Sequence, residues 1–326
     1  MRRGGIDGFI ARQGPSGCVR APHVLAWAFA VLVLVAAFAD AYVAALARDN
    51  LTNEGFNRGH ERTPADLGLA FQDVAIDSGG LRLSGWWIPG PASAQNASTT
   101  VILVHGLGST MGKVVRMWAP NLHDAGYSLL AFDLRNHGAS PDTPSGFVTY
   151  GATEADDVAA AVAYVQANAA DLRVDADRIV LYGGSMGGAT VLNAGARQVT
   201  GVIGVLADSS YASFTFQAHI DGEKKGYPRP LVDLVLDRMD ALAPKPPSSS
   251  RPDLAVQRID VPLLLAHCSD DARILLPNFW RLVDLAPPGT TTWTADCPVG
   301  LSKDHHLDGW MDPTYNATVR AFLGRL

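Results

Sequence analysis

The chain has 326 residues, of which 48% are hydrophobic and 18% are charged. This balance supplies enough apolar material for a large core and excludes a disordered chain. The net charge is −6, yet residues 1–23 alone carry +3, from four arginines and one aspartate, which leaves −9 for the rest. An acidic folded part argues against a basic nucleic-acid-binding face, so we expect no nucleic-acid partner. The three cysteines are too few for a disulfide framework or a recognisable metal cluster.

A long apolar segment follows the arginine-rich start. Residues 24–39 contain no charged side chain, and after Asp40 the apolar pattern continues to Leu46. A segment from 24 to 46 is long enough to span a bilayer as a helix. Because the arginines precede it, the positive-inside rule places residues 1–23 in the cytoplasm as a basic tail. We therefore expect a single-pass anchor in the cytoplasmic membrane, with the bulk of the chain outside.

Two other interpretations of this segment stay open. Ala37-Phe38-Ala39 before Asp40 has the small-residue pattern of a signal-peptidase site, so cleavage there would give a secreted protein. A buried core helix is the third interpretation, although the segment shows no polar face. Both the membrane-anchor and the cleaved-signal interpretations place the folded part outside the cytoplasm.

A polar stretch over residues 47–66 predicts a linker, and an α/β domain is expected over residues 67–326. Alternating residues over 71–76 and 81–88, separated by a serine-glycine-glycine turn, are typical of a β-hairpin. The continuous apolar run over 101–104 suits a central strand that is buried on both faces.

Strand and helix patterns then alternate along the chain, which predicts a mostly parallel sheet covered on both faces by helices, with an antiparallel start. Thr153 and Asp156 form a possible capping box before one helix. Residues 212–257, rich in lysine and proline, break the alternation and predict a short lid over the carboxyl edge of the sheet. The expected strands are 127–132, 178–182, 201–207, 261–266 and 290–295, and the expected helices are 158–165, 189–194, 278–285 and 313–323, with a short amphipathic run over 231–239 in the lid.

The sharpest motif is Gly-x-Ser-x-Gly, centred on Ser185, between a predicted strand and a predicted helix. A strand that turns into a helix so abruptly needs small neighbours and holds its serine out at the carboxyl edge of the sheet. Met186 opens the helix, so its N–H has no intrahelical partner and can face a developing oxyanion. We expect Ser185 to be a nucleophile.

A serine nucleophile needs a base, and the base needs an orienting carboxylate. Asp271 follows the 261–266 strand and His306 follows the last strand, which gives the chain order serine, aspartate, histidine. We expect Asp271 and His306 to complete a triad, and the N–H of Leu107, in a glycine-rich loop, to be the second oxyanion donor. His105 and His137 precede glycines and are expected to serve their own loops. Asp133 and Asp208 also end predicted strands and could be triad acids in principle, but we expect a carboxylate in such a place to cap a helix or to pair with Arg135.

The chain resembles the α/β-hydrolase superfamily, and within it the membrane-anchored serine hydrolases of the BEM46/ABHD type and the prolyl-oligopeptidase-like and S33-like peptidases. The resemblance covers residues 67 to 325. It depends on the Ser185 motif and on an Asp-Leu-Arg-Asn-His-Gly-Ala-Ser stretch from Asp133, with smaller matches at Gly85-Trp86-Trp87-Ile88-Pro89, His105-Gly106, Tyr150-Gly151, Trp310, Asp312-Pro313 and Tyr315.

One departure from the family pattern leaves the base ambiguous. The usual glycine before the catalytic histidine is replaced by Asp304 and His305. Trp310, four positions after His306, favours His306, whereas the spacing to Asp312 favours His305. Neighbours in an extended segment point in opposite directions, so only one of them can reach Ser185.

Together these features predict a serine hydrolase that cleaves an ester, thioester or amide of a small acyl substrate, without metal or organic cofactor. A peptidase that trims short peptides is the first alternative, and a catalytically silent binding module is the second. Cys268 and Cys297 each follow a strand and could form a disulfide outside the cytoplasm, but two free thiols fit the sequence equally well. The sequence does not define the oligomeric state.

Overall fold

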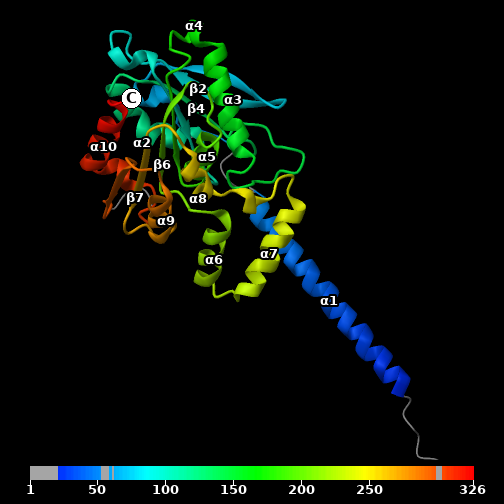
Figure 1. Ribbon diagram of the computed structural model, residues 1–326. Coiled ribbons are helices and arrows are strands. Elements are labelled where there is room, and N and C mark those ends of the chain that lie inside the picture. Colours follow the sequence, from blue (N-terminus) through cyan, green and yellow to red (C-terminus); the bar gives the residue numbers. More distant parts are fainter. Residues whose placement is uncertain (1–20, 53–58, 61, 299–302) are drawn as a thin grey trace, which may run out of the picture. The chain divides into compact units, whose positions relative to one another are not determined.

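The computed structural model describes residues 21–52, 59–60, 62–298 and 303–326 (Figure 1). The chain divides into two compact units, residues 1–43 and residues 44–326. The basic tail expected at residues 1–23 lies almost wholly outside the described residues. The second unit contains the sheet and all helices after the first one.

Helix α1, Ala21–Leu51, contains the apolar segment. Its Val24–Leu51 part is long and apolar enough to cross a membrane, a property that a signal sequence near the N-terminus shares. The helix does not end at Leu46, where a linker was expected to begin. Its last turns belong to the second unit, in which Ala47 and Leu51 are fully buried. The beginning of the expected linker is therefore helical and forms part of the domain core.

The sheet has eight strands in the order β1-β2-β4-β3-β5-β6-β7-β8. The pairs β1–β2 and β2–β4 are antiparallel, and every other neighbouring pair is parallel, which confirms the α/β architecture. Each predicted strand boundary falls within two residues of the observed one. The strands are β1 Gln72–Ser78, β2 Leu81–Ile88, β3 Thr100–Val104, β4 Ser128–Phe132, β5 Ile179–Gly184, β6 Val202–Asp208, β7 Leu263–Cys268 and β8 Thr291–Ala295.

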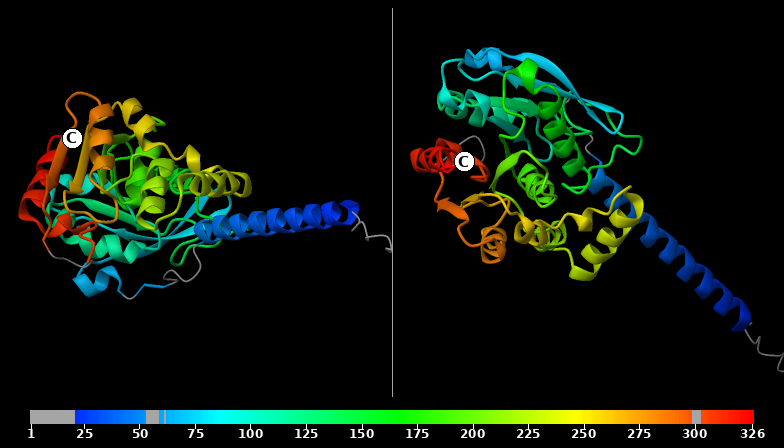
Figure 2. Two further views of the ribbon diagram at one scale, coloured as in Figure 1. Left: turned by 90° about the horizontal axis from the view of Figure 1, so that it is seen from below. Right: turned by 45° about the horizontal axis from the view of Figure 1, so that its top comes forward.

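Helices cover both faces of the sheet, so the central strands are buried on two sides (Figure 2). Alternate residues of β3 enter different cores: Ile102 and Val104 pack on the face of α3 and α5, and Val101 and Leu103 on the face of α2 and α10. The helices after α1 are α2 Met111–Asp124, α3 Glu154–Ala167, α4 Ala169–Leu172, α5 Met186–Gly195, α6 Phe214–Lys224, α7 Arg229–Leu242, α8 Pro252–Ala255, α9 Pro277–Leu285 and α10 Pro313–Leu323.

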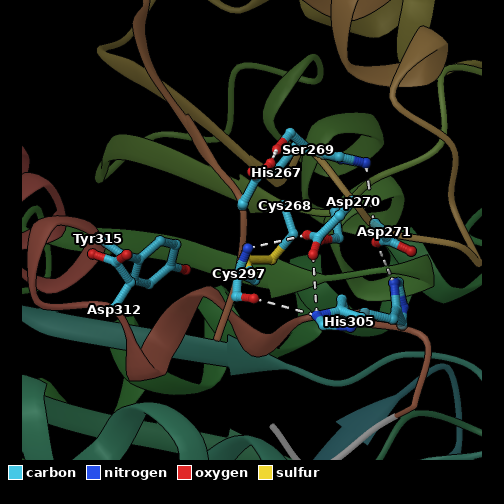
Figure 3. Close-up of a disulfide and its surroundings, with 12 residues drawn as sticks. His267, Cys268, Ser269, Asp270, Asp271, Cys297, His305, Asp312 and Tyr315 are labelled. Carbon is cyan, nitrogen blue, oxygen red and sulfur yellow. Dashed lines mark hydrogen bonds and ion pairs between the residues drawn. A yellow bond between two sulfur atoms is a disulfide. The ribbon is translucent and has the colours of Figure 1, made fainter. Parts of the chain in front are cut away.

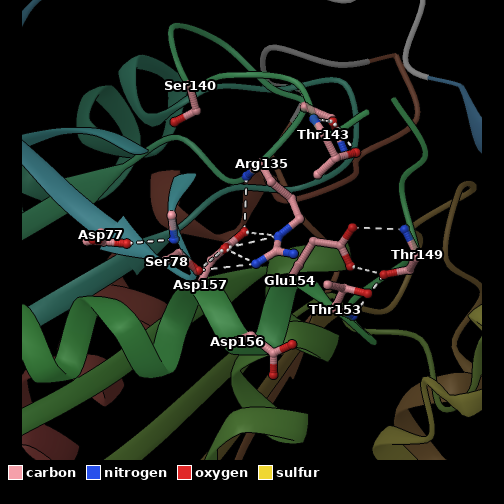
Figure 4. A network of polar contacts seen from close by, with 12 residues as sticks. Asp77, Ser78, Arg135, Ser140, Thr143, Thr149, Thr153, Glu154, Asp156 and Asp157 are labelled. Atoms are coloured by element: carbon pink, nitrogen blue, oxygen red, sulfur yellow. Dashed lines mark hydrogen bonds and ion pairs between the residues drawn. The ribbon is translucent and has the colours of Figure 1, made fainter. Parts of the chain in front are cut away.

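The capping box predicted at the start of α3 is wrong. Thr153 adopts a helical conformation and makes no side-chain cap. Glu154 has a different role, because its buried carboxylate accepts the N–H of Thr149 (Figure 4) and that of Gly151, each at 2.8 Å and each from a residue before the helix. The acidic helix start therefore orders the preceding turn instead of reaching back to Thr153.

The loop after β4 shows which of two expected roles Asp133 has: it caps a helix, and Arg135 pairs with another residue. Asp133 caps α2, since its Oδ1 accepts the N–H of Met111 at 2.8 Å. Arg135 pairs with Asp157 of α3 at 2.6 Å and also donates to Ser78 at 3.1 Å (Figure 4). These buried contacts tie the β4 loop to α3 and to the end of β1.

The segment expected to be a lid contains two longer helices, α6 and α7, before the short α8. It is attached to the loop after β7: Lys224 Nζ donates to the carbonyl of Ala272 at 2.8 Å. Asn278 of α9 donates to the side chain of Gln217 at 2.9 Å. The lid is thus fixed to the elements that carry the C-terminal half of the candidate site.

Candidate active site

Ser185 lies at the turn between β5 and α5 with φ 58° and ψ −124°. A residue other than glycine in such a conformation costs roughly 1–3 kcal/mol, which the surrounding structure must supply. Its N–H donates to the carbonyl of Asp208 at 2.8 Å. Both flanking glycines are required by close approach: a Cβ at Gly183 would lie 2.2 Å from the Gly187 carbonyl oxygen, and one at Gly187 would lie 2.3 Å from that of Val104.

A cavity of about 310 Å³ opens beside Ser185, and Leu107 and Met186 line it together with the serine. The loop that carries Leu107 lies directly against the turn, because a Cβ on Gly106 would come within 3.0 Å of the Ser185 Cβ. The structure therefore brings the expected nucleophile and both residues expected to supply oxyanion donors to the same cavity.

Asp271 and His306 form a buried pair, with 2.7 Å between Asp271 Oδ2 and His306 Nδ1. The other carboxylate oxygen of Asp271 accepts the N–H groups of Arg273 at 2.8 Å and Ile274 at 2.9 Å. Burial alone would raise the pKa of Asp271, but the neighbouring imidazole of His306 and these N–H donors lower it overall. Asp271 is therefore an ionised acceptor that fixes the orientation of the His306 ring.

The residue after His306 brings this loop to the serine turn. A Cβ on Gly184 would lie 2.8 Å from Leu307 Cδ2, so the two segments are in contact. His305 takes another direction: its Nδ1 lies 3.1 Å from Asp270 Oδ2 and 3.3 Å from the Cys297 carbonyl oxygen (Figure 3). Adjacent histidines thus pair with adjacent aspartates.

A disulfide joins Cys268 at the end of β7 to Cys297 after β8, with a Cα–Cα separation of 5.4 Å (Figure 3). The sequence left this bond and two free thiols as equal alternatives. Asp270 accepts the Cys297 N–H at 3.0 Å, so the disulfide and the exposed His305–Asp270 pair form one local unit. The bond connects the loop of Asp271 to the segment that leads towards His306.

Two other buried histidines stabilise loops. The Nδ1 of His105 lies 2.8 Å from the Gly106 carbonyl oxygen, and its Nε2 accepts the N–H of Leu134 at 3.1 Å. Burial lowers the pKa of His105 to about 4, so the ring is neutral and connects two loops. His137 makes a similar contact to the Arg135 carbonyl oxygen at 2.8 Å. In the described residues, no group of three or more histidine, cysteine, aspartate or glutamate side chains is arranged to hold a metal ion.

Sequence reasoning missed a polar network behind the serine. Tyr315 of α10 donates to Asp208 at 2.7 Å and also contacts the hydroxyl of Tyr182 in β5. All three residues are buried. Burial raises the pKa of Asp208 to about 7, although the hydrogen bonds that it accepts from the hydroxyls of Tyr315 and Ser209 act in the opposite direction. The signal was an aspartate at the end of the strand next to β5, but no local pattern links it to Tyr315.

The family model described as the alpha/beta hydrolase fold matches residues 99–316. The chain therefore belongs to the alpha/beta hydrolase family. A protein named YfhR from Escherichia coli, described as uncharacterised, is 30% identical over 211 residues, which are 64% of this chain and 65% of that protein. The chain thus matches somewhat less than two thirds of the length of this relative.

Solved structures share the same fold. The esterase Pf2001 of Pyrococcus furiosus aligns with a TM-score of 0.65 and 24% identity, over 84% of this chain and 98% of that one. Est1E of Butyrivibrio proteoclasticus, solved with bound ferulic acid, aligns with a TM-score of 0.58 and 17% identity, over 77% and 98% of the two chains. At these identities the likeness concerns the fold. The fold and its neighbours support a hydrolase, and the narrower BEM46/ABHD-type assignment stays a prediction.

Proposed function

We propose that this protein is a serine hydrolase that forms an acyl intermediate on Ser185. The observation that carries the proposal is the strained backbone of Ser185, which presents a serine from the β5–α5 turn to a cavity. Such strain persists where function requires it, because packing alone would favour a relaxed turn.

The reaction follows from the roles that we assign to the neighbouring residues. Nε2 of His306 takes the proton from Ser185 Oγ as the oxygen attacks the acyl carbon, and the N–H groups of Leu107 and Met186 stabilise the oxyanion. The carbonyl re-forms, the bond to the leaving group breaks, and His306 gives it the proton. Water then repeats the sequence on the acyl-serine and releases the acid. Asp271 stays ionised throughout and stabilises the imidazolium.

A carboxylic ester is the substrate class that the cavity supports best. Most of the residues that line it are apolar, and its volume of about 310 Å³ is at the lower end of the range for small-molecule sites. The Pyrococcus furiosus neighbour is itself named an esterase. A folded protein substrate would need a more open and more polar groove.

We further propose that α1 anchors the enzyme in the cytoplasmic membrane with the catalytic domain outside. The part of α1 that precedes the second unit, residues 24–43, is still long and apolar enough to support a membrane span, and a disulfide suits an oxidising compartment. A C-terminal reporter should be found on the outer side of the membrane and stay in the membrane pellet. A released protein that begins at Asp40 would instead show that the segment is a cleaved signal.

Two assays on the purified full chain test the reaction. A fluorophosphonate probe should label wild type and fail to label Ser185→Ala, which separates an enzyme from a silent binding module. A panel of p-nitrophenyl esters and aminoacyl anilides then separates esterase from peptidase. Faster turnover of the anilides, at matched concentrations, would contradict the ester assignment.

A further inference from the structure

We propose that the last turns of α1 form one wall of the acyl-binding cavity, and that the substrate is an amphiphilic ester drawn from the membrane. This inference depends on the proposed function of Ser185. It adds the substrate class and a second role for α1, which would bind substrate as well as anchor the protein.

The end of α1 is a fixed part of the catalytic domain. The Leu51 side chain is fully buried, and its carbonyl accepts the N–H of Val148 at 2.7 Å. The Tyr150 hydroxyl donates to the Asn50 carbonyl, and burial raises the pKa of this phenol, which keeps the donor protonated. The Tyr150 ring stacks on Phe214 of α6 with 4.2 Å between ring centroids. These contacts connect α1 to the lid, so the helix end is not a free tether.

Leu46 and Asn50 lie one helical turn apart and both line the cavity that contains Ser185. The lid supplies a second apolar wall. Five residues of α7 with the spacing of one helix face line the cavity: Leu231, Val232, Val235, Leu236 and Met239. A hydrocarbon chain esterified to Ser185 would therefore lie among apolar side chains from α1 and α7.

Charged groups also line the cavity, and two of them are exposed. Lys225 at the end of α6 and Arg273 in the loop after β7 both have exposed side chains. Asp221 is less exposed and accepts the side-chain N–H of Gln217 at 3.0 Å. Apolar walls with a charged rim match a molecule with a hydrocarbon chain and a polar head, and a purely polar peptide would leave the apolar walls without contacts.

The position of Leu46 in the chain limits its distance from the membrane. It follows Ala39, the end of the uninterrupted apolar run, by seven residues. A chain of seven residues spans at most about 25 Å even when it is fully extended. If α1 is a membrane anchor, the cavity wall is held within that distance of the bilayer in any arrangement of the two units. An ester that partitions into the bilayer would therefore be present at high local concentration.

The test measures how hydrolysis depends on acyl-chain length, using the full chain in lipid nanodiscs and p-nitrophenyl esters from acetate to decanoate. We expect kcat/KM to rise about two- to fourfold for each added methylene until the cavity is filled, because each methylene leaves water. Leu46→Trp and Val235→Trp should each reduce the octanoate-to-acetate ratio of kcat/KM at least tenfold. Leu234→Trp is the matched control, since Leu234 lies on α7, is 56% exposed and does not line the cavity.

A second arm tests the membrane as the source of substrate. A long-chain ester placed in the same nanodisc as the enzyme should be hydrolysed several-fold faster than the same amount in separate vesicles. Equal rates would refute this part of the proposal. A flat chain-length profile, or a wild-type ratio in both Leu46→Trp and Val235→Trp, would refute the cavity assignment. If one variant does not fold by circular dichroism, the other variant and the wild-type profile decide.

The fluorophosphonate probe distinguishes failure of this inference from failure of the proposed function. A protein that is labelled at Ser185 and cleaves acetate, but shows no chain-length preference, is a hydrolase without this acyl site. A protein that neither reacts with the probe nor cleaves any ester is not a serine hydrolase, and the acyl site falls with it.

Discussion

Two neighbouring histidine–aspartate pairs of the same chemistry differ mainly in their burial. In the His306–Asp271 pair the side chains are 6% and 0% exposed, and in the His305–Asp270 pair they are 27% and 35% exposed. A partly exposed pair of this kind contributes little free energy, whereas a buried one holds its ring in one orientation. Because both side chains are imidazoles, the comparison teaches that the burial and the partner of each ring decide which one can act as a base.

The backbone separates the two rings. His305 and Leu307 both adopt positive φ, at 52° and 64°, on either side of His306. The loop therefore turns at each residue, and it directs His305 to the disulfide and His306 to Asp271. If the two rings also differ in function, His306 is needed for catalysis and His305 is not.

Ser185→Ala should produce the largest effect, because it removes the atom on which either histidine would have to act. We expect kcat to fall by roughly 10⁴- to 10⁶-fold, as in other hydrolytic triads, with a melting temperature close to that of wild type. Steady-state ester hydrolysis and calorimetry on the same preparation would measure both. A variant that keeps more than a tenth of the activity would refute the proposed mechanism, and with it any catalytic meaning of the two pairs.

His306→Ala and His305→Ala test the comparison directly. The first variant should lose acylation by substrate, because it removes the imidazole that Asp271 holds at 2.7 Å. The second should lose no more than about tenfold in kcat/KM, or ~1.4 kcal/mol, because its ring lies in an exposed pair. Pre-steady-state release of p-nitrophenol measures acylation in both. The reverse pattern would assign the base to His305 and leave the roles of the other residues standing.

The sequence predicted most of the fold because hydrophobic pattern and turn residues are local signals. The bounds of β2 and α10 agree with the prediction at every residue. Helix α2 was missed although Met111, Val114 and Val115 begin a helical spacing of buried residues, and Pro120 lies in its interior, where proline is unfavourable. The end of α1 was taken for a linker because Arg48, Asp49 and Asn50 are exposed and polar, although Leu51 after them is buried.

The site was harder to predict because it is made by contacts between distant loops. The serine turn has a sequence motif, and the chain order suggested Asp271 and His306 as its partners. The choice between the two histidines depends on positive-φ positions that no motif encodes. Asp208 was considered only as an alternative to Asp271 at a strand end, and its link to Tyr315 was not predicted because it spans 107 residues.

Removing the Cys268–Cys297 disulfide tests whether the neighbouring His305–Asp270 pair is mainly structural. If it is, the removal should lower the stability of the fold more than it lowers catalysis. The double variant Cys268→Ser/Cys297→Ser should lose roughly 2–4 kcal/mol of stability. Its kcat/KM should stay within about tenfold of wild type, because Asp271 keeps its own backbone donors. Calorimetry and ester hydrolysis measure the two effects. In a denatured, air-protected sample we expect one free thiol per chain without reductant and three with it; equal counts would contradict the bond.

The smallest expected effect comes from Asp208, a second buried aspartate, which accepts hydrogen bonds from the hydroxyls of Tyr315 and Ser209. Asp271 has a lowered pKa beside His306, whereas burial raises the pKa of Asp208 to about 7 among neutral hydroxyls. Between about pH 4 and pH 7 the unfolded chain loses this proton while the folded chain keeps it, so Asp208 lowers the stability of wild type as pH rises.

Asp208→Asn can still accept the Tyr315 hydroxyl and removes this titration. The difference in melting temperature between Asp208→Asn and wild type should therefore increase by about 4–8 °C, equivalent to ~2–3 kcal/mol, from pH 5 to pH 8. Asp73→Asn, at an exposed position of β1, is the matched control and should show no such change. If the melting-temperature difference between Asp208→Asn and wild type is the same at both pH values, Asp208 ionises in the folded protein as readily as in the unfolded chain. Burial would then not be what separates Asp208 from Asp271.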